Sequence, residues 1–207
     1  MSVFTPRFLV ASLGNKEPYA QSLHSAGHFA LASLQRTLGP SQSAFSRDKK
    51  DRSLRSDGTP YTLKQSPTFM NVSGPWVSKA WKQHLADHNL KPQELALVVV
   101  SDDLEEAFGV VKIRKWQASH RGHNGLKSIN SSIKPSSYPG ARWHRISVGI
   151  GRPVDRDQKT VSDFVLSKLS SHQLSVIDQD VGSRVLECLE SLREAWEADV
   201  AKAAQGP

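Results

Sequence analysis

The stretch that most constrains the fold is the apolar run "LALVVV", residues 95–100, which ends in the acidic pair Asp102 and Asp103. The run shows no alternation of apolar and polar residues, so it predicts a strand that is covered on both faces. It is much too short to cross a bilayer. A strand of this kind is typical of a largely parallel sheet with helices packed on each side.

Other segments of the chain alternate between strand and helix patterns. Strands are predicted at residues 8–13, 110–116 and 145–151, and helices at residues 23–38, around 77–85 and over 177–196. This alternation predicts a single α/β domain over residues 1–207, with a mixed, mostly parallel central sheet flanked by helices. Residues 41–66 are polar and weakly patterned, which fits either short edge strands or a mobile loop, and residues 197–207 are expected to form a tail.

Charge and cysteine usage limit the partners and the compartment. The net charge of +7 and the pI near 9.6 favour a polyanionic partner such as RNA, DNA or an acidic membrane. Cys188 is the single cysteine, so the chain has neither an internal disulfide nor a cysteine metal cluster, and a reducing compartment is expected. No secretory signal precedes the first strand, which predicts a cytoplasmic protein, with a mitochondrial location as the alternative.

Polar residues follow two of the predicted strands. Asn15 closes the first strand, His24 lies in the connection beyond it, and Asp102 closes the central strand. Ligands of open α/β sheets bind outside the carboxyl ends of the strands, so all three are site candidates. A carboxylate that reaches a histidine fixes its tautomer and stabilises its charged form. Taken singly, each residue has a structural role as its alternative.

The chain lacks the nucleophile that a catalytic triad requires. It has no Gly-x-Ser-x-Gly motif and no suitably placed cysteine. Water activated by His24 is then the simplest hydrolytic chemistry, whereas His28, one helical turn later, is expected to be structural. His120 and His123 are three positions apart, but without matching carboxylates or cysteines they make a poor metal site.

Two asparagines and a set of basic residues complete the candidates. Asn124 opens a predicted helix and offers both a donor and an acceptor, and Asn71 is either a helix cap or a ligand contact. The basic residues are read either as a phosphate-binding rim, with Lys115 as the favoured single contact, or as a solvated basic face. They are Lys112, Arg114, Lys115, Arg121, Lys127, Arg142 and Arg145.

In order along the chain, these segments resemble the peptidyl-tRNA hydrolases of the bacterial type. The matching blocks cover about residues 7–195, and together they make the resemblance highly specific. They are "SLGNKEPYAQSLHSAG", "TFMNVSG", "LVVVSDDLE", "GHNGLK", "RISVGIGRP" and "VSDFVLSKLS".

The resemblance implies a monomer that cleaves the ester between a peptide and the 3′ ribose of tRNA, without metal or cofactor. By motif position, His24 would be the general base and Asp102 would hold the imidazole. Asn15 would distinguish peptidyl-tRNA from unblocked aminoacyl-tRNA. The residues implied to hold the peptide and the acceptor end are Tyr19, Phe69, Asn71 and Asn124.

The chain departs from the family pattern at several positions. Ser25 replaces the asparagine that usually follows the histidine, and Ser147 replaces a basic residue, for which Arg145 is a candidate substitute. The segment before Tyr19 is one residue short, which puts the role of Tyr19 in doubt. Two other functions remain: an RNA-binding protein without catalysis, like the splicing relatives of this family, and an unrelated metal hydrolase.

Overall fold

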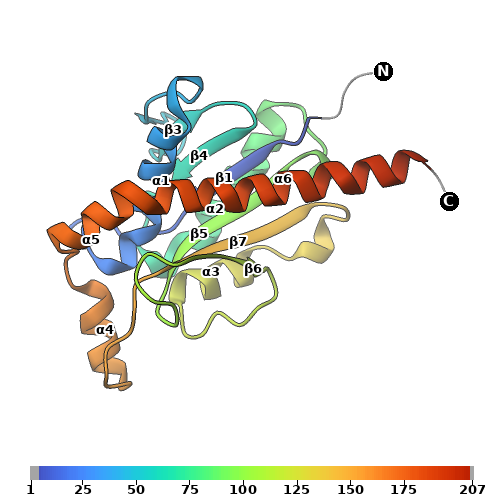
Figure 1. The fold of residues 1–207 in the computed structure, drawn as a ribbon. Coiled ribbons are helices and arrows are strands. Elements are labelled where there is room, and N and C mark those ends of the chain that lie inside the picture. The colour runs from blue at the N-terminus through green and yellow to red at the C-terminus, as the bar shows by residue number, and fades with distance from the viewer. Residues whose placement is uncertain (1–4, 206–207) are drawn as a thin grey trace.

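A computed structural model describes residues 5–205 as a seven-stranded sheet with helices on both faces (Figure 1). The strand order is β2-β3-β4-β1-β5-β7-β6. In chain order the strands are β1 (Phe8–Ser12), β2 (Ser46–Arg47), β3 (Leu54–Asp57), β4 (Tyr61–Gln65), β5 (Ala96–Asp103), β6 (Val111–Lys115) and β7 (Arg142–Gly149).

The sheet is mixed, and the parallel pairing is confined to its centre. Strands β4, β1, β5 and β7 are parallel neighbours, whereas β2, β3 and β6 join through antiparallel pairs at the two edges. The predicted α/β class and mixed sheet are therefore confirmed. The mostly parallel character holds only for the four central strands, because β2 and β3 join β4 through antiparallel pairs at one edge and β6 pairs antiparallel with β7 at the other.

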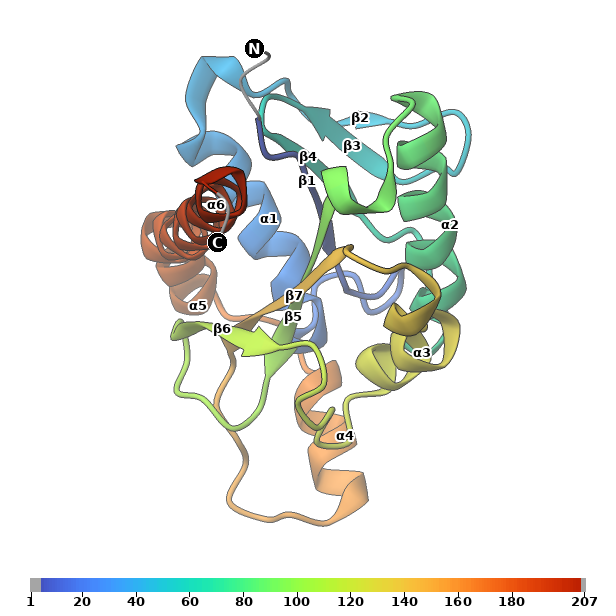
Figure 2. The same cartoon turned by 90° about the vertical axis from the view of Figure 1, so that its right-hand side faces the viewer.

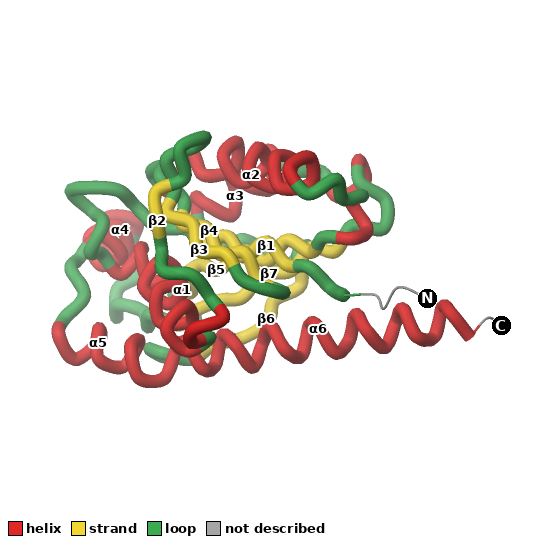
Figure 3. Tube along the Cα trace, turned by 90° about the horizontal axis from the view of Figure 1, so that it is seen from above, coloured by secondary structure: helices red, strands yellow, loops and turns green. Residues whose placement is uncertain are grey.

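Two helical layers cover the sheet (Figures 2 and 3). Helices α1 (Ala26–Thr37) and α6 (Gly182–Gln205) pack together on one face, and α2 (Ser73–Asp87) and α3 (Asn124–Ser132) pack together on the other. Strand β5 contributes to both cores, as predicted from its unbroken apolar run. Val98 and Val100 lie in the α1–α6 core, and Leu97 and Val99 lie in the α2–α3 core.

The C-terminal third contains more helix than the sequence pattern indicated. Helix α4 (Gln158–Leu166) was not anticipated as a helix, and it carries no fully buried residue. It is followed by α5 (Ser171–Val176), a π-helical turn (Ile177–Val181) and then α6. The segment expected as a tail from residue 197 is helical as far as Gln205. Residues 206–207 lie outside the described part of the chain.

The polar stretch 41–66 contains the strands β2, β3 and β4. Of its strands, β2 and β3 lie at one edge of the sheet, and β4 is largely buried between β3 and β1. The 3₁₀ turns are at Leu23–Ser25, Gly39–Ser41, Met70–Val72, Pro92–Glu94 and Pro135–Ser137. Across residues 5–205, no helix has both the length and the apolarity that crossing a membrane requires.

Candidate active site

The structure brings His24 and Asp102 into direct contact, although 78 positions separate them. His24 Nδ1 lies 2.9 Å from Oδ1 and 3.0 Å from Oδ2 of Asp102. Side chains on alternate positions of a strand share a face, so Asp102 shares the face of Val98 and Val100. That face is covered by α1, and His24 lies in the 3₁₀ turn that leads into α1.

The turn that carries His24 is held from two sides. A Cβ atom at Gly27 would lie 2.7 Å from the carbonyl oxygens of both Leu13 and Val100, so glycine lets α1 begin against the ends of β1 and β5. On the other side, the Leu23 amide donates to the Ser167 carbonyl at the end of α4. These contacts fix the imidazole beside Asp102 through the backbone.

His123 is a third member of this group that the sequence reading did not place there. Its Nε2 lies 3.0 Å from Asp102 Oδ1, and its ring centroid lies 4.9 Å from that of His24. Its Nδ1 accepts hydrogen bonds from the amides of Gly125 and Leu126 and so caps α3. We call His24, Asp102 and His123 the histidine cluster. In the sequence, His123 is considered only as a weak metal ligand with His120, although it lies in the block "GHNGLK" beside the candidate Asn124.

The partners of the two imidazoles settle where their protons lie. Because backbone amides only donate, His123 Nδ1 is an acceptor, and the proton of neutral His123 is on Nε2, from which it donates to Asp102. His24 likewise donates from Nδ1 to Asp102. Its Nε2 therefore carries the free lone pair, and no described residue occupies it. The His24 side chain keeps 12% of its surface exposed, whereas Asp102 keeps 2%.

Burial and charge act in opposite directions on the pKa values of this cluster. Burial lowers the pKa of His24, but the charge and hydrogen bonds of Asp102 outweigh it, so this pKa lies above 6.5. Burial also raises the pKa of Asp102, but the charges and hydrogen bonds of His24 and His123 hold it well below its usual range. Asp102 is thus an anion at neutral pH.

Asn15 lies next to this cluster and is tied to it through Ser25. The backbone N–H of Asn15 donates to Ser25 Oγ at 3.0 Å, and Ser25 Oγ donates to the carbonyl of Tyr19 at 3.1 Å. Asn15 Oδ1 accepts from the Met70 amide at 2.9 Å. The serine that departs from the family pattern is completely buried and anchors both Asn15 and the Tyr19 segment.

The remaining predicted contacts surround this centre less closely. Phe69 precedes Met70 and lies under the Lys16 ammonium, 4.6 Å from it to the ring centroid. Asn71 is exposed and does not cap α2, whose start has no side-chain cap. Asn124 is exposed at the first position of α3. Lys115 ends β6 opposite His144, four residues down the sheet from the level of Asp102.

Several members of the expected basic rim are neutralised within the protein. Arg114 pairs with Asp103 and Glu106 and donates to Ser147 Oγ, and Lys112 pairs with Glu106. The buried Arg145 donates to the carbonyl of Ala118. Of the seven residues in the rim, Lys115, Arg121, Lys127 and Arg145 make no ion pair with any residue of the described chain, and Arg145 differs from the other three because it is buried.

His28 and His120, the two other histidines considered from the sequence, have hydrogen-bond partners nearby in the chain or in the fold. His28 is buried with its Nδ1 2.8 Å from Ser12 Oγ, and burial lowers its pKa to about 4, which fits the expected structural role. His120 accepts from the Gly122 amide and does not join His123 as a metal ligand pair. One nitrogen of His24, one of His123 and a carboxylate oxygen of Asp102 lie within 4.8 Å of one another. The contacts of His24 Nδ1 and His123 Nε2 within this group are the hydrogen bonds to Asp102.

Comparisons with known proteins identify the family of the chain. The family model described as Peptidyl-tRNA hydrolase matches residues 9–206. The peptidyl-tRNA hydrolase of Corynebacterium diphtheriae is 33% identical over 87% of this chain and 95% of its own length. That of Citrifermentans bemidjiense is 35% identical over 90% of this chain and 94% of its own.

The solved structures agree with the fold. The crystal structure of peptidyl-tRNA hydrolase from Acinetobacter baumannii has a TM-score of 0.68 and 25% identity, with 96% of each chain covered. A probable peptidyl-tRNA hydrolase of Schizosaccharomyces pombe is 35% identical over 64% of this chain and 61% of its own length. A match of the family model to nearly the whole chain, with relatives above 30% identity that cover most of it, shows that the chain belongs to the peptidyl-tRNA hydrolase family.

Proposed function

We propose that the chain hydrolyses the ester that joins the peptide to the 3′ ribose in peptidyl-tRNA, by means of water activated by His24. One observation carries this proposal: His24 donates to the buried Asp102 through Nδ1 and keeps Nε2 free. An imidazole in this tautomer, held by a carboxylate, is poised to accept a proton.

In the proposed reaction, His24 Nε2 takes a proton from water as the water oxygen attacks the ester carbonyl carbon. The carbonyl π bond breaks, and the tetrahedral intermediate carries a negative charge on the former carbonyl oxygen. When the intermediate collapses, the bond to the ribose 3′ oxygen breaks, and the His24 imidazolium returns its proton to that oxygen. Asp102 stays ionised throughout and stabilises the imidazolium.

Neutral amides around this base suit a substrate whose peptide sequence varies. Asn15 Oδ1 accepts a hydrogen bond from the Met70 amide, whereas Asn15 Nδ2 makes no hydrogen bond with any residue among 5–205. We assign this donor to the carbonyl groups of the substrate, where it also supports discrimination against unblocked aminoacyl-tRNA. Asn71 and Asn124 are assigned to the peptide and the acceptor end, because both side chains are exposed beside the cluster.

Aromatic and basic residues are assigned to the RNA. Tyr19 and Phe69 keep 41% and 36% of their surface exposed, so both are assigned to contacts with the terminal bases. The Lys16 ammonium covers one face of the Phe69 ring, which leaves the other face for stacking. Lys115 is assigned to a backbone phosphate, since it has no carboxylate partner within the described chain. The resulting substrate is a peptidyl-tRNA of any sequence, bound without metal or cofactor.

The test is release of the acyl group from N-acetyl-aminoacyl-tRNA, with EDTA present and absent. We expect activity to persist in EDTA and to fall by about 10³- to 10⁴-fold in His24→Ala, because the general base is lost. His172→Ala, which removes an exposed histidine of α5, is the matched control and should retain full activity.

Two outcomes would replace this proposal. Tight tRNA binding without turnover by the unmodified chain would indicate a binding protein. Loss of turnover in EDTA, restored by a divalent cation, would indicate a metal hydrolase. A His24→Ala variant with normal kcat would remove His24 as the base in either case.

A further inference from the structure

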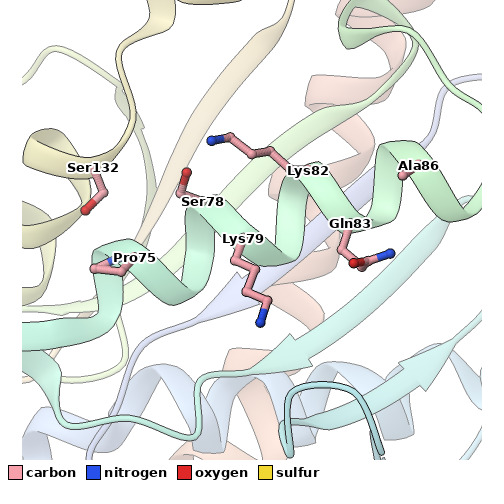
Figure 4. A pocket seen from close by; sticks show the side chains of 7 residues that line it. All are labelled: Pro75, Ser78, Lys79, Lys82, Gln83, Ala86 and Ser132. Atoms are coloured by element: carbon pink, nitrogen blue, oxygen red, sulfur yellow. The ribbon is translucent and has the colours of Figure 1, made fainter.

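An open groove along α2 has no part in the reaction proposed above. It has a volume of about 540 Å³, and Figure 4 shows the side chains that line it. We call it the α2–α3 groove, because α2 supplies most of its lining and α3 supplies one residue. Its residues are Pro75, Ser78, Lys79, Lys82, Gln83, Ala86 and Ser132.

The residues that line this groove are either positively charged or neutral. Residues 58–86 and 107–154 contain no aspartate or glutamate, so the only carboxylate on α2 and α3 is Asp87 at the end of α2. Asp87 is bound by Lys50 and Gln83. No residue that lines the groove carries a negative charge. Asp48, Asp51 and Asp87 line the neighbouring pocket together with Lys79, and each of these carboxylates pairs with Lys50 or Lys64.

The two lysines of the groove are available to a ligand. Lys79 and Lys82 make no ion pair or hydrogen bond with any residue in the described chain, and both are exposed. Figure 4 shows their side chains extending outward from α2, with Lys82 on the side of Ser78. By contrast, Lys112 and Arg114 at the sheet edge are occupied by Glu106 and Asp103. Lysine side chains that have no carboxylate partner can bind a polyanionic ligand.

The groove lies on two helices that both begin beside the candidate active site. Helix α2 begins three residues after Met70, whose amide donates to Asn15, and α3 begins directly after His123. The Ser128 hydroxyl accepts from the Gly74 amide and joins the two helices near these starts. At 1.5 Å per residue, Lys79 and Lys82 lie about 9 and about 14 Å along α2 from Ser73. A ligand that ends at His24 and is longer than its 3′ terminus can extend along this path.

We propose that the α2–α3 groove binds the sugar-phosphate backbone of the tRNA acceptor arm, behind the 3′ end that the active site holds. This inference rests on the proposed function. Lysine ammonium groups contact phosphates as point charges, and the hydroxyl group of Ser78 can donate to a backbone oxygen. The Ser132 hydroxyl already donates to the Ser128 carbonyl. No aromatic ring lines the groove to read a base. Recognition here is therefore independent of sequence, as an enzyme that acts on every tRNA requires.

The test compares two substrates in the Lys79→Gln/Lys82→Gln variant. One is N-acetyl-aminoacyl-tRNA, and the other is the same acyl group on a CCA trinucleotide, which ends before the groove. We expect KM for the tRNA to rise about tenfold at low salt with kcat unchanged, and both constants for the trinucleotide to stay as in the unmodified chain. The slope of log affinity against log salt should fall in magnitude by about 1.8, for two lost phosphate contacts.

The matched control is Arg7→Gln/Lys202→Gln, which removes the same charge near the two chain ends. Both residues are exposed and make no ion pair among residues 5–205. This control should keep the unmodified KM and salt slope, which separates a local contact from a change in net charge. An equal KM rise in the control, or a normal tRNA KM in the groove variant, would overturn the proposal.

Failure of the groove and failure of the proposed function give different results. If the unmodified chain hydrolyses neither substrate, the proposed function fails, and the groove is then tested by fluorescence anisotropy with deacylated tRNA. A tenfold weaker Kd in the groove variant still supports the groove, and an unchanged Kd rejects it. If both substrates lose activity equally in the variant, the lysines act on the site itself and the proposal is wrong.

Discussion

The protein buries two charged clusters, and their difference separates a structural role from a chemical one. The first is the histidine cluster at the carboxyl end of β5. The second, which we call the lysine cluster, contains Lys64 of β4, Asp48, Asp51 and Trp76. Lys64 Nζ lies 2.9 Å from Asp48 and 2.8 Å from Asp51, and the Trp76 indole donates to Asp51.

In the lysine cluster, each charge has an opposite charge within reach. Lys64 lies between two carboxylates, Arg55 lies 3.7 Å from Asp48, and the side chains of Lys64 and Asp48 are 7% and 8% exposed. These contacts bind the turn between β2 and β3 to β4 and to α2. In the histidine cluster, by contrast, one nitrogen lone pair of His24 is left over and reaches solvent. The fully paired lysine cluster therefore has a structural role, whereas the unbonded Nε2 of His24 can accept a proton.

The largest predicted effect is on stability, from Lys64→Met. This change leaves two buried carboxylates facing each other, and we expect it to cost about 3 kcal/mol of unfolding free energy at pH 7. In the unmodified chain, burial raises the pKa of Asp48 and Asp51, but hydrogen bonds and charge outweigh it and lower both values. Asp48 is stabilised as an anion by the Lys50 backbone amide and Lys64, and Asp51 by Lys64 and Ser53. Their contribution is thus present above about pH 4 and is lost as the pH falls through the lowered values. The cost should shrink towards pH 3, as urea unfolding at both pH values can measure.

The control for that prediction is Lys50→Met, which breaks an ion pair with Asp87. The Lys50 side chain is 60% exposed, so we expect a loss below about 1 kcal/mol. In both variants, kcat/KM below the unfolding temperature should stay within about threefold of the original. A hundredfold loss in folded Lys64→Met would mean that the lysine cluster takes part in the chemistry, and the comparison would fail.

The next effect is on catalysis, from Asp102→Asn. The amide still reaches His24 but carries no charge, so the imidazolium formed in the reaction loses its stabilisation, and kcat should fall about 10²-fold. Activity requires neutral His24, so it rises with pH through the pKa of His24. Without Asp102, burial acts unopposed on this pKa. The midpoint of the pH profile should move from above 6.5 to below it, measured as kcat/KM from pH 5 to 9.

Asp103→Asn is the matched control, because Asp103 adjoins Asp102 but pairs with Arg114 at the sheet edge. Its pH midpoint should not move. A midpoint that moves upward in Asp102→Asn, or equal shifts in both variants, would show that Asp102 does not set the basicity of His24.

The sequence supports the contact between His24 and Asp102 better than the rest of the cluster. An apolar strand that ends in Asp102 and a helix start at His24 place both at one sheet edge, so topology predicts that they meet. His123 could not be predicted in the same way. It reaches Asp102 only because its ring also caps α3, and this depends on where α3 begins.

The lysine cluster shows a second limit of sequence reasoning. Residues 41–66 read as polar because Asp48, Asp51 and Lys64 look like surface charges, although they neutralise one another inside the fold. The spacing of hydrophobic residues cannot reveal a group of ion-paired side chains such as this one. The position of β4 between β3 and β1 is likewise fixed by pairing with distant strands, and local pattern does not encode it.

The smallest predicted effect, from His123→Asn, tests whether the second histidine matters to the first. Asparagine is a good helix cap, so α3 should persist and stability should change by less than about 1 kcal/mol, but its shorter side chain no longer reaches Asp102. His24 then becomes the only hydrogen-bond donor to that carboxylate, which strengthens the interaction with the imidazolium and raises the pKa of His24. We expect kcat to fall about tenfold and the pH midpoint to move upward, opposite to Asp102→Asn. If the midpoint stays unchanged while activity falls, His123 acts only by positioning α3 and Asn124, and the histidine cluster reduces to a pair.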